Sequence, residues 1–292
     1  MRVAVDRDGQ LDIYLGSDNL TRSHRVLAPA RAFPPPVGEG LTVVVLNLDH
    51  PELILPLMQA LAGVQESFLA RGLGCNLVIG DTGSTDGQVL AAYDSAPDWV
   101  TVVRDLTYQF SRSNNDCLAA QPPHHRVLLL NNDVIFTGPG PIVAMYDAFD
   151  EHPGAGVVGL CLDYPDGTIQ HWGIDLLREG PARGFPYHPG TTRQGVHRPG
   201  RTFPAIATTG ACLMIGADTW RQLGGLDEQY EKECQDVDLC LAARRVGLGV
   251  LVVDAGPVQH LENATRPCGE ESWPDRRLLL RRWRAYLESS FL

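Results

Sequence analysis

Short apolar runs alternate with helix-length segments between Thr42 and Asn131, and this alternation restricts the fold more than any other feature of the sequence. Four runs rich in β-branched residues or leucine have the length of buried strands, at 42–47, 75–80, 99–103 and 126–131. The segments between them predict helices, with Pro51 in one first turn and Asp86 and Ser111 as caps of the next two. Strands separated by helices form a mainly parallel sheet with helices on its faces, so we expect an α/β fold.

The second half of the chain is less regular. Apolar runs predict strands at 156–162, 205–215 and 249–253, and helices at 218–223 and 236–246. Residues 178–204 are rich in Gly, Pro, Arg and His and have no periodic pattern. A long irregular segment inside a compact domain is usually functional or mobile.

Both ends of the chain differ from the centre. Apolar stretches at 3–5 and 11–15 predict a β-hairpin, and a run of prolines at 34–36 predicts a stiff linker. The last segment alternates arginine with Leu, Trp and Tyr, as a basic amphipathic helix does. We therefore expect three parts: a β extension with its linker (1–40), the main domain (41–267) and a C-terminal helix (268–292).

Composition excludes some classes of protein. The formal net charge of -11 argues against a dedicated nucleic-acid binder, although a divalent cation could still provide local positive charge for an anionic ligand. The seven cysteines form no CxxC pair, which argues against a zinc ribbon and favours a reducing, cytoplasmic setting. No uninterrupted apolar stretch approaches the roughly 18 residues of a membrane span.

Two predicted strands end in polar residues, and ligands of open α/β sheets bind beyond such carboxyl ends. Asp81 follows the second strand and could accept a hydrogen bond from a nucleobase or ribose; turn chemistry is the alternative. Asp133 follows the fourth strand, after Asn131 and Asn132. A carboxylate there is costly unless it is paired or bound to a cation, and Mg²⁺ and Mn²⁺ often use one or two carboxylates plus substrate phosphates. An ordinary Asn/Asp turn is the alternative.

Two further positions carry candidate chemistry. Asp236 and Asp238 are both eligible as a base for hydroxyl activation; alternatively, Asp236 caps a helix and Asp238 complements its dipole. His260 follows the last predicted strand, and a lone histidine is more often a satisfied structural residue than a ligand.

The order of these motifs resembles the inverting glycosyltransferase family two, which has the GT-A fold, and is most similar to bacterial O-antigen and cell-surface polysaccharide transferases, including rhamnosyltransferases. The resemblance covers about residues 42–267. Its motifs are VVVLN, GDTGSTDG, FSRSNNDCLAA, LLLNNDV, IQHWG, TTGACLMI, LGGLDEQY, QDVDLCLAARRVG and HLENATR. The implied fold is a GT-A, Rossmann-like mixed sheet, mostly parallel and flanked by helices, with a small N-terminal β extension.

The resemblance implies roles for individual residues. Asp236 would be the catalytic base, and Asp133 and His260 would bind a divalent metal, Mn²⁺ or Mg²⁺. Asn131 stands in the place of a first metal-motif Asp, and Gln235 in the place of a Glu of many relatives. The residues implied in nucleotide and donor binding are Asn47, Asp81, Ser84, Arg112, Asn132, Gly210 and Ala211. Apart from the resemblance, His171, Trp172, His188 and Asp238 are candidate acceptor residues, and for the first three buried packing is the alternative.

The implied reaction is a metal-assisted single displacement in cell-surface polysaccharide synthesis. A sugar would move from a UDP- or dTDP-sugar to a hydroxyl of a saccharide or lipid-linked acceptor. The alternative is a catalytically degenerate module that binds a nucleotide sugar. The C-terminal helix could contact the inner face of an anionic membrane, pack on its own domain or join a homodimer.

Two rival enzymes fit the sequence less well. Sugar nucleotidyltransferases resemble one another by a Gly-rich loop with Arg and Lys after the first strand, whereas this chain has Asn47 to Pro51 there. A phosphatase-like motif between Asp163 and Thr168 is one residue too long, and a hairpin turn at Asp166-Gly167 is the better interpretation.

Overall fold

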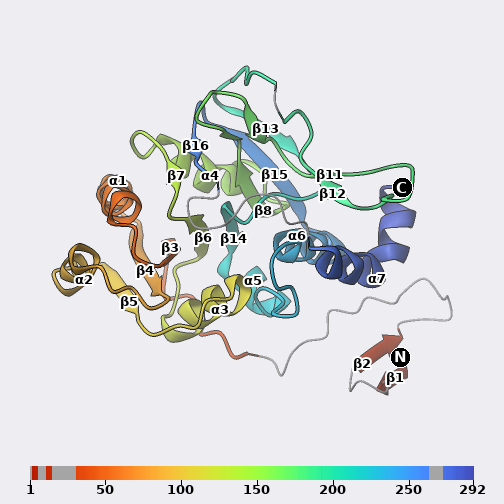
Figure 1. Cartoon of the computed structure of the whole chain (residues 1–292), viewed down its shortest axis with the longest axis horizontal. Coiled ribbons are helices and arrows are strands. Elements are labelled where there is room, and N and C mark those ends of the chain that lie inside the picture. Colours follow the sequence, from red (N-terminus) through yellow and green to blue (C-terminus); the bar gives the residue numbers. More distant parts are fainter. Residues whose placement is uncertain (1, 6–10, 15–30, 192, 263–271) are drawn as a thin grey trace.

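The protein is described by a computed structural model, which covers residues 31–191, 193–262 and 272–292 and the backbone of 2–5 and 11–14. An eight-stranded sheet forms its centre (Figure 1). The order across the sheet is β13 (Arg201–Pro204), β15 (Gly249–Asp254), β8 (Ala155–Leu160), β14 (Cys212–Gly216), β6 (Arg126–Asn131), β3 (Gly40–Asn47), β4 (Gly74–Asp81) and β5 (Val100–Val103).

Most strands of this sheet are parallel. β5, β4, β3 and β6 are parallel neighbours, and β8 is parallel to β15. β14 is antiparallel to both β6 and β8, and β13 is antiparallel to β15. The predicted α/β class with a mixed, mostly parallel sheet is therefore confirmed.

Helices cover both faces of the sheet because successive strand residues point to opposite sides. Val43 and Val45 pack with α1 (Pro51–Ala70), α2 (Gly87–Asp94) and α4 (Gly140–Glu151). Val44 packs with the opposite group, α3 (Phe110–Ala120), α5 (Ala217–Leu223), α6 (Gln235–Arg245) and α7 (Trp273–Ser290). Figure 1 shows α1 and α2 on one side of the sheet and α6 and α7 on the other.

The other described strands form three smaller sheets. One has the order β10 (Ile169–His171), β9 (Leu162–Asp163), β16 (Gln259–His260) and β7 (Val134–Ile135). β11 (Asp175–Leu176) pairs with β12 (Pro186–Tyr187). β1 (Arg2–Val5) pairs antiparallel with β2 (Leu11–Tyr14), which is the pairing of a hairpin. The predicted turn at Asp166-Gly167 joins β9 to β10, where Gly167 has a φ of 80°.

Several predicted boundaries need correction. Asp86 does cap α2, accepting the N–H groups of residues 88 and 89. Ser111, however, is buried inside α3, whose cap is Gln109. Asp236 lies in the first turn of α6 rather than at its cap, which is Cys234. The strand predicted at 205–215 begins only at Cys212, because residues 205–211 form a loop that reaches the pocket described below.

One helix among the described residues, α1, is long and apolar enough to cross a membrane on length and composition alone. The sequence was expected to contain no such segment. In the structure α1 packs on the central sheet through a stripe at helical spacing, formed by Ile54, Leu57, Leu61, Val64 and Phe68. Its apolar composition is therefore explained by packing on the core.

The C-terminal helix also packs on the domain. α7 buries Leu279, Trp283 and Leu287 in the core on the α6 side of the sheet. The apolar side of α7 is therefore buried against its own domain. Packing on its own domain was one of the three interpretations that the sequence allowed for this helix. The predicted boundary between 267 and 268 lies outside the described residues.

Candidate active site

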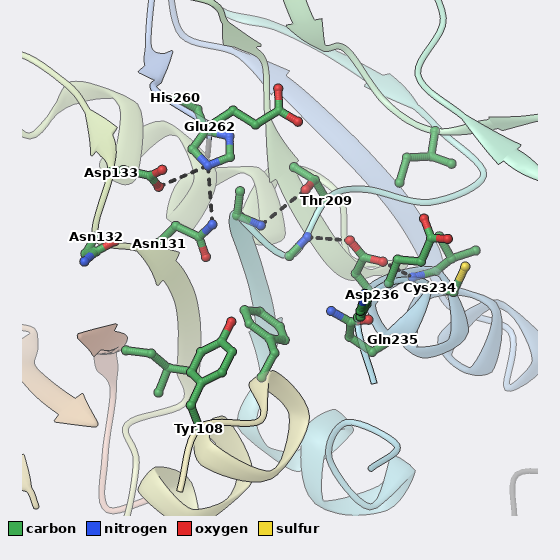
Figure 2. Close-up of a pocket in the computed structure, with 18 of the residues that line it drawn as sticks. Tyr108, Asn131, Asn132, Asp133, Thr209, Cys234, Gln235, Asp236, His260 and Glu262 are labelled. Carbon is green, nitrogen blue, oxygen red and sulfur yellow. Dashed lines mark hydrogen bonds and ion pairs between the residues drawn. The ribbon is translucent and has the colours of Figure 1, made fainter. Parts of the chain in front are cut away.

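A cavity of about 430 Å³ opens at the carboxyl ends of β3 and β6. The chain continues from β3 to β4 and β5 on one side, and returns to β6 on the other, so the strand order reverses at this position. Ligands of open α/β sheets bind at such reversals. The lining comes from the ends of these strands, the loop 209–211, the start of α6, and residues 260 and 262 (Figure 2).

Two asparagines fix the strand ends to each other. The side-chain amide of Asn132 donates to Asn47 Oδ1 (2.8 Å), and the amide of Asn47 donates to Asp49 O (2.8 Å) and Tyr93 Oη (2.9 Å). Both N–H groups of the Asn47 amide are therefore used inside the protein. Both asparagines line the cavity, and Asn47 has a positioning role there.

Asp133 and His260 form the candidate metal pair. Asp133 Oδ1 lies 3.1 Å from His260 Nε2 and has no hydrogen-bond partner among the described residues, although it is buried. Cis ligands of an octahedral Mg²⁺ or Mn²⁺ lie about 3 Å apart, so the pair fits such an ion. The described residues contain no group of three or more His, Cys, Asp or Glu that could hold a metal. A cation here would take its remaining ligands from substrate and water.

The side chains that line the cavity carry more negative than positive charge, which disfavours the binding of an anion. The lining contains four carboxylates, of Asp133, Glu233, Asp236 and Glu262, against the cations of Lys232 and Arg276. The guanidinium of Arg276 is already paired with Glu233, at 2.9 and 3.3 Å. A diphosphate in this pocket therefore needs an additional cation, which the Asp133–His260 pair could hold.

Asp236 lies across the pocket from that pair, with the loop at Thr209 between them (Figure 2). Its Oδ2 accepts the N–H of Gly210 and its Oδ1 accepts the N–H of Val237, both at 2.8 Å. Burial raises the pKa of Asp236 above its ordinary value, although these two hydrogen bonds act in the opposite direction. The carboxylate is therefore held in one orientation, with a pKa shifted towards neutral pH, as suits a base.

Gly210 permits this arrangement by its lack of a side chain. A Cβ at this position would lie 3.2 Å from the ring of Phe110 and 3.5 Å from Asp236 Cβ. Gly210 and Ala211 both line the cavity.

Three residues implied in nucleotide binding lie outside the lining. Asp81 is buried and accepts the N–H of Ser84 at 3.3 Å, while Ser84 Oγ accepts the N–H of Asp49 at 2.8 Å. Arg112 is exposed on α3 and pairs with Glu228 at 3.2 Å. In this structure Asp81 and Ser84 shape the loop beside the pocket, and the neighbouring Thr82 contributes to the lining.

The candidate acceptor residues separate into three environments. His188 lines the cavity, and His171 is buried behind it. Trp172 instead lines a neighbouring hollow and contacts the ring of His197 at a tilt of 54°, with ring centroids 5.3 Å apart. Asp238 is fully buried on the far side of α6, where it accepts hydrogen bonds from Trp283 Nε1 (2.7 Å) and Tyr230 Oη (3.1 Å). The structure does not bring Trp172 or Asp238 to the cavity.

Sequence reasoning missed other lining residues, including Tyr108, Thr209, Glu262 and Arg276. Tyr108 and Glu262 lie in loops without a periodic pattern. Arg276 reaches the cavity only because α7 packs beside α6, a long-range contact that has no signal in the sequence.

Comparison with known proteins supports this description. No family profile matches the sequence. The chain is 30% identical over 274 residues to the uncharacterized protein y4gI of Sinorhizobium fredii, a match that covers 91% of this chain and 28% of that protein. It is 26% identical over 249 residues to the O-antigen biosynthesis protein RfbC of Myxococcus xanthus, covering 83% and 18%. The chain thus spans less than a third of the length of these two relatives.

A third relative is closer in length. The N-acetylglucosaminyl-diphospho-decaprenol L-rhamnosyltransferase of Mycobacterium tuberculosis is 29% identical over 222 residues, which covers 68% of this chain and 70% of that protein.

Solved structures share the fold. GalNAc-T7 with UDP, GalNAc and Mn²⁺ superposes with a TM-score of 0.62 at 12% identity, over 87% of this chain and 51% of that chain. The mannosyltransferase PcManGT of Pyrobaculum calidifontis, in complex with GDP-Man and Mn²⁺, gives 0.56 at 15% identity, over 88% and 66%. At these identities the likeness concerns the fold alone.

The central sheet, its helices and the pocket at its strand ends define an α/β protein of the GT-A fold. In sequence the chain is similar to an O-antigen biosynthesis protein and to a rhamnosyltransferase, and these likenesses together with the fold support a GT-A glycosyltransferase related to polysaccharide rhamnosyltransferases. The resemblance found in the order of the sequence motifs is confirmed to this extent.

Proposed function

We propose that this chain transfers a sugar from a UDP- or dTDP-sugar to a hydroxyl of a saccharide or lipid-linked acceptor, with inversion and with the help of Mn²⁺ or Mg²⁺. The observation that carries the proposal is the position of a rigid carboxylate, Asp236, across one pocket from the Asp133–His260 pair (Figure 2). The polysaccharide-related relatives support the class of product.

Asp236 would act as the base. Its carboxylate would take the proton of the acceptor hydroxyl as that oxygen attacks the anomeric carbon of the donor. Backbone N–H groups hold both carboxylate oxygens, so the base is oriented before the acceptor arrives. Gln235 cannot serve as a second acid or base at this position. A single base acting on the acceptor supports direct displacement, which inverts the anomeric configuration.

Asp133 and His260 would hold the divalent cation. When bound, the cation would offset the negative charge that develops on the leaving diphosphate. The four carboxylates of the lining support this requirement. The structures of GalNAc-T7 and PcManGT, which contain Mn²⁺ with UDP or GDP-Man, support it by analogy.

The Asp236→Asn variant tests the role of the base. We expect release of nucleoside diphosphate from UDP- or dTDP-sugars, with saccharide acceptors present, to fall by about 10²- to 10⁴-fold, because the amide cannot take a proton. Metal-dependent nucleotide binding should remain. Asp98→Asn is the matched control, since Asp98 is exposed and lies outside the pocket. Near-wild-type turnover in a folded Asp236→Asn protein would exclude Asp236 as the base.

The same assay decides the alternative function. If the wild-type chain binds nucleotide with Mn²⁺ but releases no product from any donor and acceptor tested, it is a binding module. Asn131 and Gln235, which replace carboxylates of the family pattern, are the observations that favour this alternative.

A further inference from the structure

The motif IQHWG (169–173) has no role in the function proposed above, yet two of its residues contact histidines of the pocket. Gln170 and His171 are consecutive in β10, whose register with β9 shifts between Ile169 and His171, and their side chains reach different histidines. Gln170 contacts His260, and His171 contacts His188. Both Gln170 and His171 are buried.

Gln170 makes two reciprocal hydrogen bonds with His260. Its amide N–H donates to the backbone carbonyl of His260 at 3.0 Å, and this fixes which end of the amide is oxygen. The amide Oε1 then faces His260 Nδ1 at 2.6 Å and can only accept a hydrogen bond. His260 therefore carries a proton on Nδ1.

The other nitrogen of His260 faces the pocket. The amide of Asn131 lies 3.3 Å from His260 Nε2 and can donate to a lone pair there. Asp133 Oδ1 is 3.1 Å from the same nitrogen but accepts no hydrogen bond from any described residue. The Asn131 contact agrees with a lone pair on Nε2, which is the form of histidine that binds metals, and the Asp133 contact agrees with it when a cation lies between the carboxylate and the ring.

His171 determines the protonation of His188 in the same way. The backbone N–H of Thr209 donates to His171 Nε2 at 3.4 Å, and the Thr208 hydroxyl, with its Oγ1 3.0 Å from the same nitrogen, can donate to it as well, so this nitrogen has a lone pair and the proton is on Nδ1. His171 Nδ1 lies 3.0 Å from His188 Nδ1 and must donate to it. His188 therefore carries its proton on Nε2, on the part of the ring that His171 does not contact.

We propose that β10 sets the tautomers of both pocket histidines: Gln170 leaves a lone pair on His260 Nε2 for the divalent cation, and His171 leaves an N–H on His188 Nε2 for an oxygen of the acceptor saccharide. The proposal rests on the proposed function, because it assigns each nitrogen to one ligand of that reaction. Gln170 and His171 are positioning residues, since they act through the histidines that meet the ligands.

Nitrogen-15 NMR of the histidine rings in the full chain tests the tautomers directly, without any ligand. We expect the Nδ1–H form for His260 and His171 and the Nε2–H form for His188, with signals assigned by His→Gln variants. An Nε2–H or doubly protonated His260 at neutral pH would overturn the first half. An Nδ1–H form of His188 would overturn the second.

Mn²⁺ binding in the presence of UDP tests the consequence for the metal, measured as free Mn²⁺ by electron paramagnetic resonance. Gln170→Leu removes the acceptor at His260 Nδ1 and should weaken Mn²⁺ binding about 10- to 100-fold. Gln170→Glu keeps an oxygen acceptor there and should bind as well as the wild type. Equal affinity in all three proteins would refute the role of Gln170. If the wild type itself bound no Mn²⁺, the metal-dependent function would fail, while the NMR experiment would still decide the tautomers.

The two halves of the proposal predict separate effects. His171→Phe should change the tautomer of His188 and leave Mn²⁺ affinity unchanged, whereas Gln170→Leu should change His260 and leave His188 unchanged. If either substitution changed both histidines alike, β10 would have only a general structural role. Should Gln170→Leu fail to fold, Gln170→Glu and the wild-type spectrum still test the claim.

Discussion

The chemistry of the pocket depends on a few side chains whose burial destabilises the folded protein when no ligand is bound. Asp133 is buried, and its Oδ1 has no hydrogen-bond partner among the described residues. A buried acceptor without a partner costs about 1–3 kcal/mol of stability. Under the proposed function, a cation held together with the adjacent His260 would satisfy this carboxylate.

The Asp133→Asn variant should therefore have opposite effects on the stability of the unliganded protein and on metal-dependent nucleotide binding. Without ligand, we expect unfolding free energy to increase by about 1 kcal/mol, because the buried charge is removed. The stabilisation of the wild type by Mn²⁺ with UDP, dTDP, GDP or CMP should disappear in the variant. Thermal unfolding with and without each nucleotide measures both effects and identifies the preferred base. A variant that is less stable than the wild type and keeps its Mn²⁺ response would contradict this interpretation of Asp133.

At the scale of elements, α7 is attached to α6 by a buried polar network. Asp238 is fully buried and accepts hydrogen bonds from Trp283 Nε1 and Tyr230 Oη. Arg282 pairs with Asp227 and lies 3.7 Å from Asp238. This network explains why Asp238, a candidate for the site from sequence, has a structural role in the fold.

Asp238→Ala should destabilise the protein by about 3–5 kcal/mol, because it leaves the buried donors of Trp283 and Tyr230 without their acceptor and removes one of the two carboxylates near the buried Arg282. Chemical denaturation measures the loss. Asp218→Ala is the control: Asp218 is exposed and, among the described residues, its ion pair is with Arg221 at 3.0 Å, so its removal should cost less than about 1 kcal/mol. Similar losses in the two variants would show that the buried network adds no particular stability.

A second buried group ties the irregular segment 178–204 to the sheets. His197 lies between Asp254 (Nδ1 to Oδ1, 2.8 Å) and Asp163 (Nε2 to Oδ2, 2.5 Å). Burial lowers the pKa of His197, but the hydrogen bonds to the two carboxylates outweigh it, and the net shift is upward. Burial raises the pKa of Asp254, but hydrogen bonds from Arg198 N–H and His197 make its net shift downward.

The stability from this group should depend on pH. Because the pKa of His197 is raised on folding, its contribution is complete below its ordinary value of 6.5 and is lost as the pH rises through the folded pKa. Because the pKa of Asp254 is lowered, its contribution is complete above 3.8 and is lost as the pH falls through the folded pKa. The excess stability of the wild type over His197→Gln should therefore be largest between these two values. Denaturation at several pH values measures it, and a constant difference would contradict the assignment.

At the scale of the whole molecule, charge is distributed unevenly. The chain has a net charge of -11, yet α7 exposes Arg277, Arg281 and Arg284 on one helical face, near Trp273. The apolar side of α7 is buried in the domain, so the helix cannot insert into a bilayer in this conformation. We propose only an electrostatic contact with an anionic membrane at the cytoplasmic face, where a lipid-linked acceptor would be presented.

Vesicle flotation tests this contact. The protein should float with phosphatidylserine-containing vesicles at low ionic strength and be released by salt, because exposed charges are screened. Replacing Arg277, Arg281 and Arg284 by Glu should abolish flotation, and uncharged phosphatidylcholine vesicles are the control. Salt-resistant binding, or binding that survives the triple substitution, would indicate a different surface.

The sequence by itself determined the fold class, the positions of the main strands and helices, and the polar residues at the ends of β4 and β6. These features depend on local periodicity and on the rule that polar residues at parallel strand ends meet at one edge. Tertiary structure alone decided that Asp236 faces the pocket while Asp238, two residues later, faces Trp283. It also decided that Gln170 meets His260 across 90 residues of chain and that Arg276 reaches the lining. Such contacts arise when separate elements pack together, and packing between distant segments leaves no periodic pattern in the sequence.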